Sequence, residues 1–292
     1  MSIRAVAPAS TANLGPGFDS AAAALDLWNE LTVEQSLATS HVEIEIEGEG
    51  EGELPRDATH LALRAFAIFA PVEKYSFRFV NRIPLERGLG SSAAAIALGL
   101  VAGASAAGRD VGPAELLTTG ARLENHVDNL AAAIYGGVCV AWTRDHGPRA
   151  ARIATDMPLS PVVVVPAART NTAHSRSDLP FTVSHEDAAA NVASATLLGA
   201  AIATGSATLL RDAFHDRLHE QYRMTSSPLL QQLRDEPPAG SSGVTLSGSG
   251  PSVVVWADPA QVDAVVAQLE RDLPAETMVL ALRVAQEGAR LA

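Results

Sequence analysis

A glycine-rich segment at residues 84–94 (PLERGLGSSAA) has the residue types of a phosphate-binding loop. Gly88 and Gly90 allow the backbone to turn tightly and to approach a ligand closely. A long uncharged run follows, and the free amides at the start of a helix carry the positive end of its dipole. The hydroxyls of Ser91 and Ser92 could also contact phosphate or Mg²⁺. The segment is therefore a candidate loop for the phosphates of a nucleotide.

The same letters fit the glycine pattern of dinucleotide-binding folds, and Asp110 lies 20 residues beyond Gly90. In those folds the glycine turn follows its strand directly, and the acidic residue ends a second strand. Here residues 81–87 come between strand and turn, and Asp110 follows Gly108 and Arg109. The context argues against a dinucleotide. A purely structural turn before an alanine-rich helix stays open.

A second candidate segment lies at residues 8–19 (PASTANLGPGFD). Gly15 and Gly17, on either side of a proline, favour a bent loop. That loop would present the amide of Asn13 and the carboxylate of Asp19, and a carboxylate can pair with an ammonium group. An ordinary surface turn is the alternative.

Two more segments combine polar side chains with turns. Residues 120–129 (GARLENHVDN) concentrate polar groups between two apolar stretches. Glu124 could bind Mg²⁺, and Asp128 could orient or deprotonate a hydroxyl. Residues 246–252 (LSGSGPS) form another glycine turn with backbone donors.

Composition excludes several classes of protein. Lys+Arg 21 against Asp+Glu 33 gives a formal net charge of −12, which disfavours nucleic acid and anionic membranes as partners. The only lysine, Lys74, lies in neither the context of a Walker A loop nor that of a protein kinase. The only cysteine, Cys139, excludes an internal disulfide and indicates a reducing compartment. Because no signal-peptide pattern is present either, we expect a cytoplasmic protein.

Residues 88–108 carry no charge over the length of a membrane span. They are mostly Ala, Gly and Ser, so their transfer into lipid would gain little free energy. We expect a buried helix instead, and no membrane contact.

Interleaved strands and helices must position these segments. Strict alternation in residues 41–47 places Val42, Ile44 and Ile46 on one face of a strand. The predicted strands are 41–47, 75–80, 138–143, 162–165, 252–256 and 278–284, and the predicted helices are 59–70, 91–108, 113–124, 185–204, 207–219, 228–235 and 259–271. Hairpin-like strand pairs favour the α+β class over a doubly wound sheet. The poorly periodic stretch 144–158 predicts a boundary between two domains, residues 1–155 and 156–292.

Taken in order, the four segments resemble those of the GHMP small-molecule kinases. Two further stretches extend the resemblance, residues 172–180 (TAHSRSDLP) and residues 216–223 (DRLHEQYR). The resemblance spans the whole chain and is closest to the members that phosphorylate homoserine. It implies a two-domain GHMP kinase-like fold in which the glycine-rich phosphate loop leads into a buried helix.

The resemblance also implies ATP and Mg²⁺ as cofactors and a set of site residues. The implied ATP-binding residues are Pro84, Arg87, Gly88, Leu89, Gly90, Ser91, Ser92, Ala93 and Ala94. The implied metal ligands are Ser91, Ser92 and Glu124. The implied substrate-binding residues are Asn13, Asp19, His126, Asp128, Asn129, Thr172, Arg176, Arg223 and Gly248, with Asp128 and Asn129 as the catalytic residues.

The implied reaction is in-line transfer of the γ-phosphoryl group from MgATP to the side-chain hydroxyl of L-homoserine, as in threonine biosynthesis. The alternatives are another hydroxyl substrate, such as threonine or mevalonate, and a non-catalytic binding protein with the same fold. Arg176 and Arg223 favour a carboxylate and Asp19 an amine, hence an amino acid. The family's Gly-His-Pro-Asp-Asn begins with Asn125 here and has valine for proline, which leaves the substrate less certain than the chemistry. Whether Asp128 is a base or an orienting group stays open, as does a homodimer.

Overall fold

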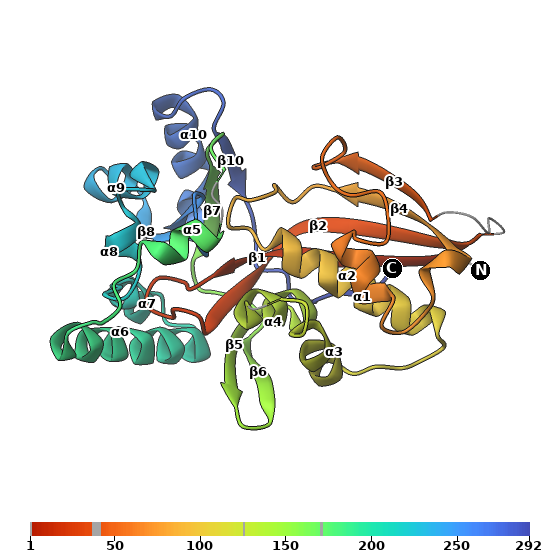
Figure 1. Ribbon diagram of the computed structural model, residues 1–292. Helices are drawn as coiled ribbons and strands as arrows, with labels where there is room; N and C mark the ends of the chain where they lie inside the picture. Colours follow the sequence, from red (N-terminus) through yellow and green to blue (C-terminus); the bar gives the residue numbers. More distant parts are fainter. Residues whose placement is uncertain (1, 37–41, 125, 170–171) are drawn as a thin grey trace.

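Two β-sheets form the framework of the protein in the computed structural model, which describes residues 2–36, 42–124, 126–169 and 172–292. Helices pack against both sheets, as Figure 1 shows. The side chains of residues 172–174 lie outside this description.

The first sheet has seven strands in the described residues. Its main path is β11 (Arg290–Leu291), β1 (Ser2–Ala12), β2 (Ala21–Gln35), β4 (Tyr75–Asn81) and β3 (Glu43–Gly48), while β2 also pairs with β5 (Val138–Arg144) and β5 with β6 (Gly147–Ala154). The pairs are antiparallel except β3 with β4. In β3, Ile44 and Ile46 are buried and the intervening glutamates are exposed, as the alternation predicts.

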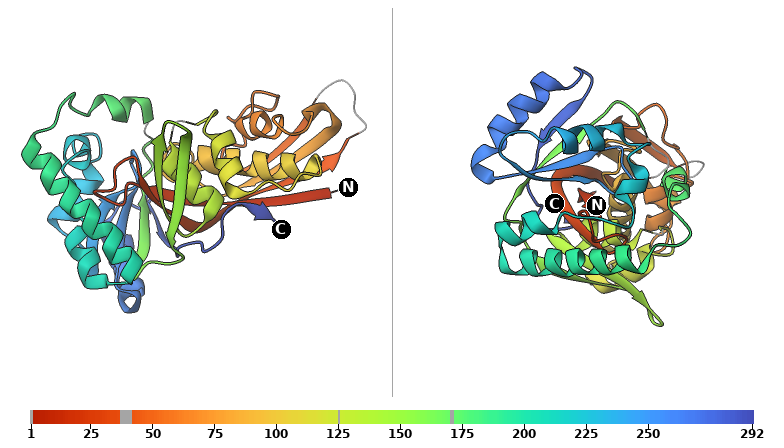
Figure 2. Two further views of the ribbon diagram at one scale, coloured as in Figure 1. Left: turned by 90° about the horizontal axis from the view of Figure 1, so that it is seen from below. Right: turned by 90° about the vertical axis from the view of Figure 1, so that its left-hand side faces the viewer.

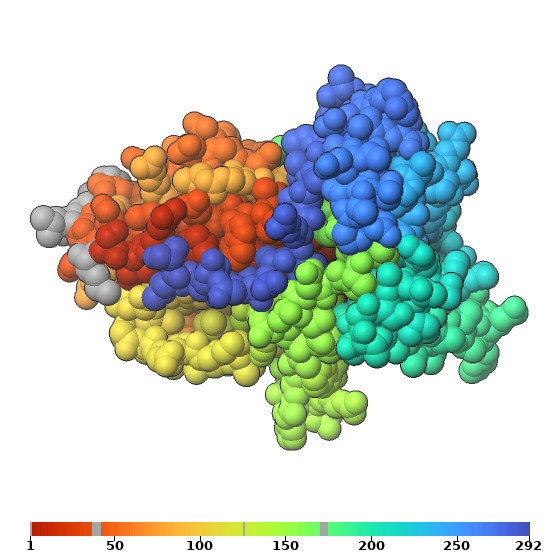
Figure 3. Space-filling model, turned by 180° about the vertical axis from the view of Figure 1, so that it is seen from behind, coloured from red at the N-terminus to blue at the C-terminus, as the bar shows by residue number. Residues whose placement is uncertain are grey.

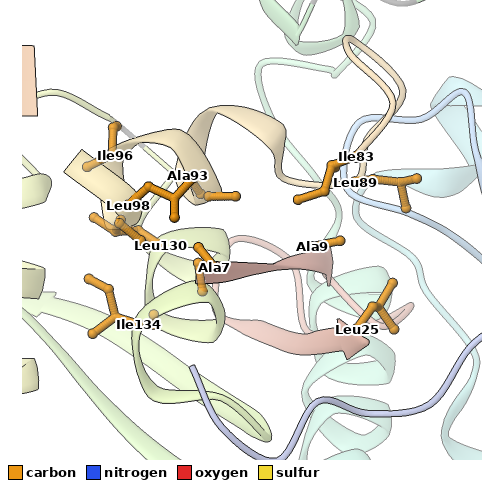
Figure 4. Packing of buried hydrophobic residues seen from close by; sticks show 14 of the residues in the cluster. Ala7, Ala9, Leu25, Ile83, Leu89, Ala93, Ile96, Leu98, Leu130 and Ile134 are labelled. Carbon is orange, nitrogen blue, oxygen red and sulfur yellow. The ribbon is translucent and has the colours of Figure 1, made fainter. Parts of the chain in front are cut away.

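Helices cover one face of this sheet. They are α1 (Leu61–Phe66), α2 (Ser91–Ala106), α3 (Pro113–Gly120) and α4 (Val127–Tyr135). In Figure 4, Ile96 and Leu98 of α2 lie above Leu130 and Ile134 of α4, and the small residue Ala7 of β1 lies beside α4. Burying each of these large side chains contributes roughly 1.5–3 kcal/mol. This burial explains the charge-free run of α2.

The second sheet is antiparallel, with the order β10 (Met278–Ala281), β7 (Ser160–Val165), β9 (Val253–Ala257) and β8 (Ser241–Leu246). Val162 and Val164 face one hydrophobic cluster, which contains residues of α9 (Pro228–Asp235) and α10 (Val262–Asp272). Val163 and Val165 face the larger cluster shared with the first sheet. A strand that is buried on both faces needs an unbroken apolar sequence, and β7 has one.

The remaining helices lie at the end of the molecule opposite the N-terminus, as Figure 2 shows. They are α6 (His185–Thr204), α7 (Ala207–Ala213) and α8 (Glu220–Arg223), and α5 (Thr172–Ser177) lies near the second sheet. Two 3₁₀ turns complete the elements, η1 (Val72–Lys74) and η2 (Pro259–Gln261). Among the described residues, no helix is long and apolar enough to cross a membrane.

The α+β class and the glycine-rich loop leading into a buried helix are confirmed, but some element predictions were wrong. The stretch 144–158 contains β6, the outer strand of an exposed hairpin that turns through Gly147 (φ 94°). The helix predicted for 207–219 ends at Ala213, because Phe214 leaves the helical conformation and stacks on Trp256. No strand was predicted for β1, whose small residues are buried on both faces and do not alternate.

The end of the chain returns to the first sheet. Residues 283–292 run along β1 and β2, where Leu291 pairs with Ala5 and the amide of Ala285 donates to the carbonyl of Ala24 (3.0 Å). Figure 3 shows this blue segment lying against the red N-terminal strand. The predicted boundary near residue 155 falls between the strands of the two sheets, but these last residues do not stay with the second sheet.

Candidate active site

The four polar segments meet around a cavity of about 190 Å³, the first cavity. Its lining residues are Ala12, Asn13, Asp19, Glu86, Gly88, Leu89, Gly90, Ser91, Ser92, His126, Asp128, Asn129, Arg176, Arg223, Gly248 and Ser249. Both halves of the chain therefore contribute to one site.

The turn between β1 and β2 joins the two halves through Asn13. This buried side chain donates to the carbonyl of Gly248 (2.9 Å) and accepts from the amide of Asp19 (3.0 Å). Asn13 and Leu14 both have positive φ, at 73° and 47°, and asparagine is one of the few residues that tolerates this conformation. Asn13 thus orders the turn that presents Asp19 and also lines the first cavity, and its binding of substrate stays a prediction.

The glycine-rich turn is held from two sides. Ser10 donates its amide to the carbonyl of Leu89 (3.1 Å), and Ser247 donates its hydroxyl to the carbonyl of Gly88 (2.7 Å). A Cβ on Gly90 would lie 2.0 Å from the Oγ of Ser10, and the φ of Gly90 is 66°. Only glycine meets both conditions, so the turn is fixed in place before any ligand arrives.

Four of the predicted ATP-binding residues, Pro84, Arg87, Ala93 and Ala94, line neither this cavity nor the second one described below. The amide of Ala94 donates to Gly90 (2.9 Å), which leaves the amides of residues 91–93 without an acceptor inside the helix. Arg87 donates to the carbonyls of Pro166 (3.0 Å) and Ala167 (2.9 Å). Arg87 therefore fastens the turn to the segment after β7.

Glu124 accepts hydrogen bonds from two neighbours. The Oγ of Ser92 lies 2.6 Å from one carboxylate oxygen, and the Nδ1 of His126 lies 2.6 Å from the other. Burial raises the pKa of Glu124, but the bonds from His126 and Ser92 outweigh it and hold the pKa at about 2. The bond to Glu124 in turn raises the pKa of His126. The result is an ionised carboxylate beside the phosphate loop.

Two oxygen donors, from Glu124 and Ser92, suit a hard cation such as Mg²⁺. The described residues contain no group of three or more His, Cys, Asp or Glu side chains that could hold a metal. Ser91, also predicted as a ligand, has no contact with Glu124 among the bonds found in the described chain. A magnesium ion would therefore need further oxygens from phosphate and water, which is how Mg²⁺ usually binds beside nucleotides.

Asp128 lies in the first turn of α4 and is buried (4% exposed). Burial raises its pKa to about 6, although the bond from the amide of Asn129 (2.7 Å) lowers it. The Oδ1 of Asn129 accepts from the Oγ of Ser10 (2.8 Å). The two predicted catalytic residues thus lie together at the cavity wall.

Arg223 is a buried cation in the same wall (3% exposed). It donates to His219 (3.1 Å) and to the carbonyls of Ser175 (3.3 Å) and Gly248 (3.4 Å), and burial lowers its pKa. His219 lies 2.9 Å from the carbonyl of Gly15 through Nε2, so that nitrogen carries the proton and Nδ1 accepts from Arg223. The sequence analysis left His219 without a role in the site, and the structure shows that it orients Arg223.

Arg176 and Asp19 form an ion pair with each other, with both carboxylate oxygens 3.0 Å from one guanidinium nitrogen. Both side chains are partly exposed, at 45% and 44%. They were predicted to hold opposite ends of the substrate, and they lie close enough to do so. The side chain of Thr172 and the whole of Asn125 lie outside the described residues.

A second cavity, of about 370 Å³, shares Glu86, Ser91 and Ser92 with the first, and no sequence pattern pointed to it. Its other lining residues are Asn29, Glu53, Leu54, Pro55, Thr59, His60, Leu61, Phe79, Asn81, Leu85, Ala95, Leu98 and Arg169. Most of them are apolar residues that read as ordinary core in a sequence. The free amides at the start of α2 lie between the two cavities.

Comparisons with known proteins agree with this geometry. Residues 54–137 match the model of the GHMP kinases N terminal domain, and residues 198–275 match that of the GHMP kinases C terminal. A homoserine kinase of Moorella thermoacetica is 42% identical over 257 residues, 85% of this chain and 85% of the relative. A homoserine kinase of Streptomyces coelicolor is 39% identical over 290 residues, 95% of this chain and 92% of the relative.

Solved structures agree as well. The crystal structure of a homoserine kinase from Cytophaga hutchinsonii superposes with a TM-score of 0.86 at 25% identity. The match covers 100% of this chain and 97% of that one. The resemblance therefore includes both sheets.

Proposed function

The chain belongs to the GHMP kinases and, within them, to the homoserine kinases, and we propose that its first cavity transfers the γ-phosphoryl group of ATP to the side-chain hydroxyl of L-homoserine. The products would be O-phospho-L-homoserine and ADP. One observation carries the choice of a substrate with a carboxylate: Arg223 is a buried cation whose hydrogen-bond acceptors, among the described residues, are all neutral. A substrate carboxylate would supply the missing countercharge.

The zwitterion of an amino acid also suits the pair of Asp19 and Arg176. Opening a partly exposed ion pair costs little, since such pairs contribute about 0–1 kcal/mol. Asp19 would then bind the ammonium group, and Arg176 would join Arg223 on the carboxylate. The ion pair between Asp19 and Arg176 is then replaced by two, one from Asp19 to the ammonium group and one from Arg176 to the carboxylate. A zwitterion is therefore favoured over a substrate that has only one charge.

The phosphates would bind the amides at the start of α2, and Mg²⁺ would bind Glu124 and Ser92. A bound Mg²⁺ would neutralise the charge that develops on the phosphates during transfer. His126 keeps the carboxylate of Glu124 turned toward Ser92 by holding its other oxygen. Gly88 and Gly90 keep the turn close to the cavity.

The base and ribose of ATP would occupy the second cavity. It adjoins the phosphate-binding turn through Ser91 and Ser92, and its walls are mostly apolar. A nucleobase gains free energy when it leaves water for such walls. None of its residues except the two serines was expected to bind ATP.

Asp128 would orient the hydroxyl of the substrate by accepting its hydrogen bond. With a pKa of about 6 the carboxylate is mostly ionised at neutral pH and is only a weak base. Positioning of the hydroxyl and neutralisation of phosphate charge then account for most of the catalysis.

Phosphoryl transfer to a panel of acceptors tests the proposal. The purified protein is incubated with ATP, Mg²⁺ and homoserine, threonine, serine, mevalonate or 4-amino-1-butanol, and phosphorylated products are identified by mass spectrometry. We expect phosphohomoserine as the main product and little reaction of the amino alcohol, which lacks the carboxylate. A preference for the amino alcohol would contradict the role given to Arg223. A preference for mevalonate, which has a carboxylate but no amine, would contradict the role given to Asp19.

A homodimer and a cytoplasmic location remain proposals. The buried free thiol of Cys139, whose pKa burial raises to about 12, suits a reducing compartment but does not require one. Light scattering of the purified protein tests the dimer.

A further inference from the structure

His60 lines the second cavity and is almost completely buried, with 4% of its surface exposed. Its Nδ1 accepts a hydrogen bond from the amide of Ala62 (3.2 Å) and so caps α1. Its ring lies on Phe79, with centroids 4.5 Å apart. Burial lowers the pKa of His60 to about 4, so the ring is neutral at neutral pH. Because Nδ1 is an acceptor, the single ring proton is on Nε2.

Among the described residues, that Nε2–H group has no acceptor. It is buried and unpartnered within the part of the chain that the structure describes. Buried donors without an acceptor are rare, since they lose their hydrogen bonds to water and gain nothing. The Oγ of Ser252 is also buried and has no partner in the described part of the chain, but Ser252 lines neither cavity.

We propose that His60 donates a hydrogen bond from Nε2 to a ring nitrogen of the nucleobase of ATP and thereby helps to select the nucleotide. The proposal rests on the proposed function, because it takes the second cavity as the nucleoside site. The ring nitrogens N1, N3 and N7 of adenine are acceptors, whereas its amino group is a donor and would meet Nε2–H unfavourably. The lining of the cavity includes Leu54, Leu61 and Leu98, and among the described residues no protein group accepts from Nε2, so a ligand in this cavity would supply the acceptor.

The choice among the ring nitrogens determines how selective the site is. An acceptor at N1 would distinguish adenine from guanine and hypoxanthine, whose N1 carries a proton. An acceptor at N3 or N7 would be present in all three bases. The first arrangement predicts a preference for ATP over GTP and ITP, and the second predicts none from this residue.

The test measures ATP binding by calorimetry without homoserine, so that the result does not depend on phosphoryl transfer. His60→Asn retains a capping acceptor for α1 but has no atom at the position of Nε2. We expect about tenfold weaker ATP binding, equal to about 1.4 kcal/mol, in a protein that is still folded at the assay temperature. His60→Gln can place an amide N–H near that position and should bind ATP more tightly than His60→Asn. His215→Asn, at an exposed histidine outside both cavities, is the matched control.

Deaza analogues of ATP provide a second test that needs no variant. In the wild-type protein, one of 1-deaza-, 3-deaza- and 7-deaza-ATP should bind about tenfold more weakly than ATP. In His60→Asn that same analogue should lose no further affinity, because the two changes remove one interaction.

Two results would overturn the proposal. One is unchanged ATP affinity in a folded His60→Asn protein. The other is that His60→Asn weakens the binding of ATP and of all three analogues by the same factor, which would give His60 a purely structural role. A wild-type protein that binds no ATP at all would refute the proposed function instead, so the two failures can be distinguished.

Discussion

The two cavities share the start of α2 but offer a ligand different kinds of contact. The first holds Asp19, Asp128, Arg176 and Arg223 in about 190 Å³ and is built by both halves of the chain. The second is larger, about 370 Å³, mostly apolar, and apart from Arg169 built by residues 29–98. Charged groups specify a substrate through a few strong contacts, whereas an apolar wall gives affinity that depends on buried area. Substitutions in the first cavity should therefore change the KM for the phosphoryl acceptor and kcat. Substitutions in the second cavity should change the KM for the nucleotide alone.

The largest effect is expected from Glu124→Gln. If Glu124 holds Mg²⁺ as proposed, loss of its charge should lower kcat at least about 100-fold, or about 2.7 kcal/mol, because the metal would no longer be held where it neutralises the phosphate charge. ATP binding without Mg²⁺ should change less than twofold, since the second cavity is intact. Steady-state kinetics and calorimetry measure the two quantities, with Glu276→Gln at an exposed site as the control. Near-normal turnover at saturating Mg²⁺ would remove Glu124 from the metal site.

The two arginines should differ from each other. Arg223→Ala should raise the KM for homoserine about 30-fold, because bonds to a charged group contribute about 1.5–3 kcal/mol. Arg176→Ala should raise it only a few-fold, since Arg176 is exposed and its loss also frees Asp19.

The KM for ATP checks this comparison and should stay within twofold in both variants. Arg223 also donates hydrogen bonds to the carbonyls of Ser175 and Gly248, so its loss could disturb the local structure. Arg223→Lys therefore serves as the second variant, because lysine keeps the charge but lacks the planar guanidinium with its several donors. If the KM for ATP rose as much as that for homoserine, the effect would be structural and the carboxylate assignment would fail.

The second cavity should give the opposite pattern. Leu61→Ala should raise the KM for ATP about tenfold, near 1.4 kcal/mol, because it removes apolar surface from the nucleoside wall. The KM for homoserine should not change. Ile68→Ala, at an apolar side chain that is 41% exposed and lines neither cavity, is the control. Equal changes in both KM values would mean that the cavities are not independent.

The sequence predicts the first cavity much better than the second, and the reason is chemical. Asp19, Glu124 and Arg176 stand out because charged residues beside glycine turns need an explanation. Leu61 and Leu98 have the same identity in a nucleoside site as in any core, so only coordinates separate the two.

Roles that depend on a partner are hidden in the sequence for a similar reason. His219 can be assigned to Arg223 only once Gly15 is seen to fix its tautomer. In the fold, β7 was predictable because both of its faces are buried and residues 162–165 are all valine. β1 was not, because alanine, serine and threonine at its buried positions carry no periodic signal.

The smallest expected effect is on the free energy of unfolding, which the buried charge of Asp128 in the first cavity lowers. A folded-state pKa of about 6 for Asp128, against about 3.9 in an unfolded chain, means that the folded protein binds more protons between these pH values. The contribution of Asp128 to stability therefore falls as pH rises from about 4 to about 6, and above pH 6 the buried charge is destabilising. Asp128→Asn should raise the free energy of unfolding by about 1 kcal/mol at pH 8, because a neutral amide replaces that charge while its oxygen still accepts from Asn129. Urea unfolding at pH 8 and pH 5 measures this gain, which should shrink at pH 5 as the wild-type carboxyl becomes protonated. A variant that is less stable than the wild type at pH 8 would show that the ionised carboxylate is compensated within the fold, and the weak-base assignment would lose its support.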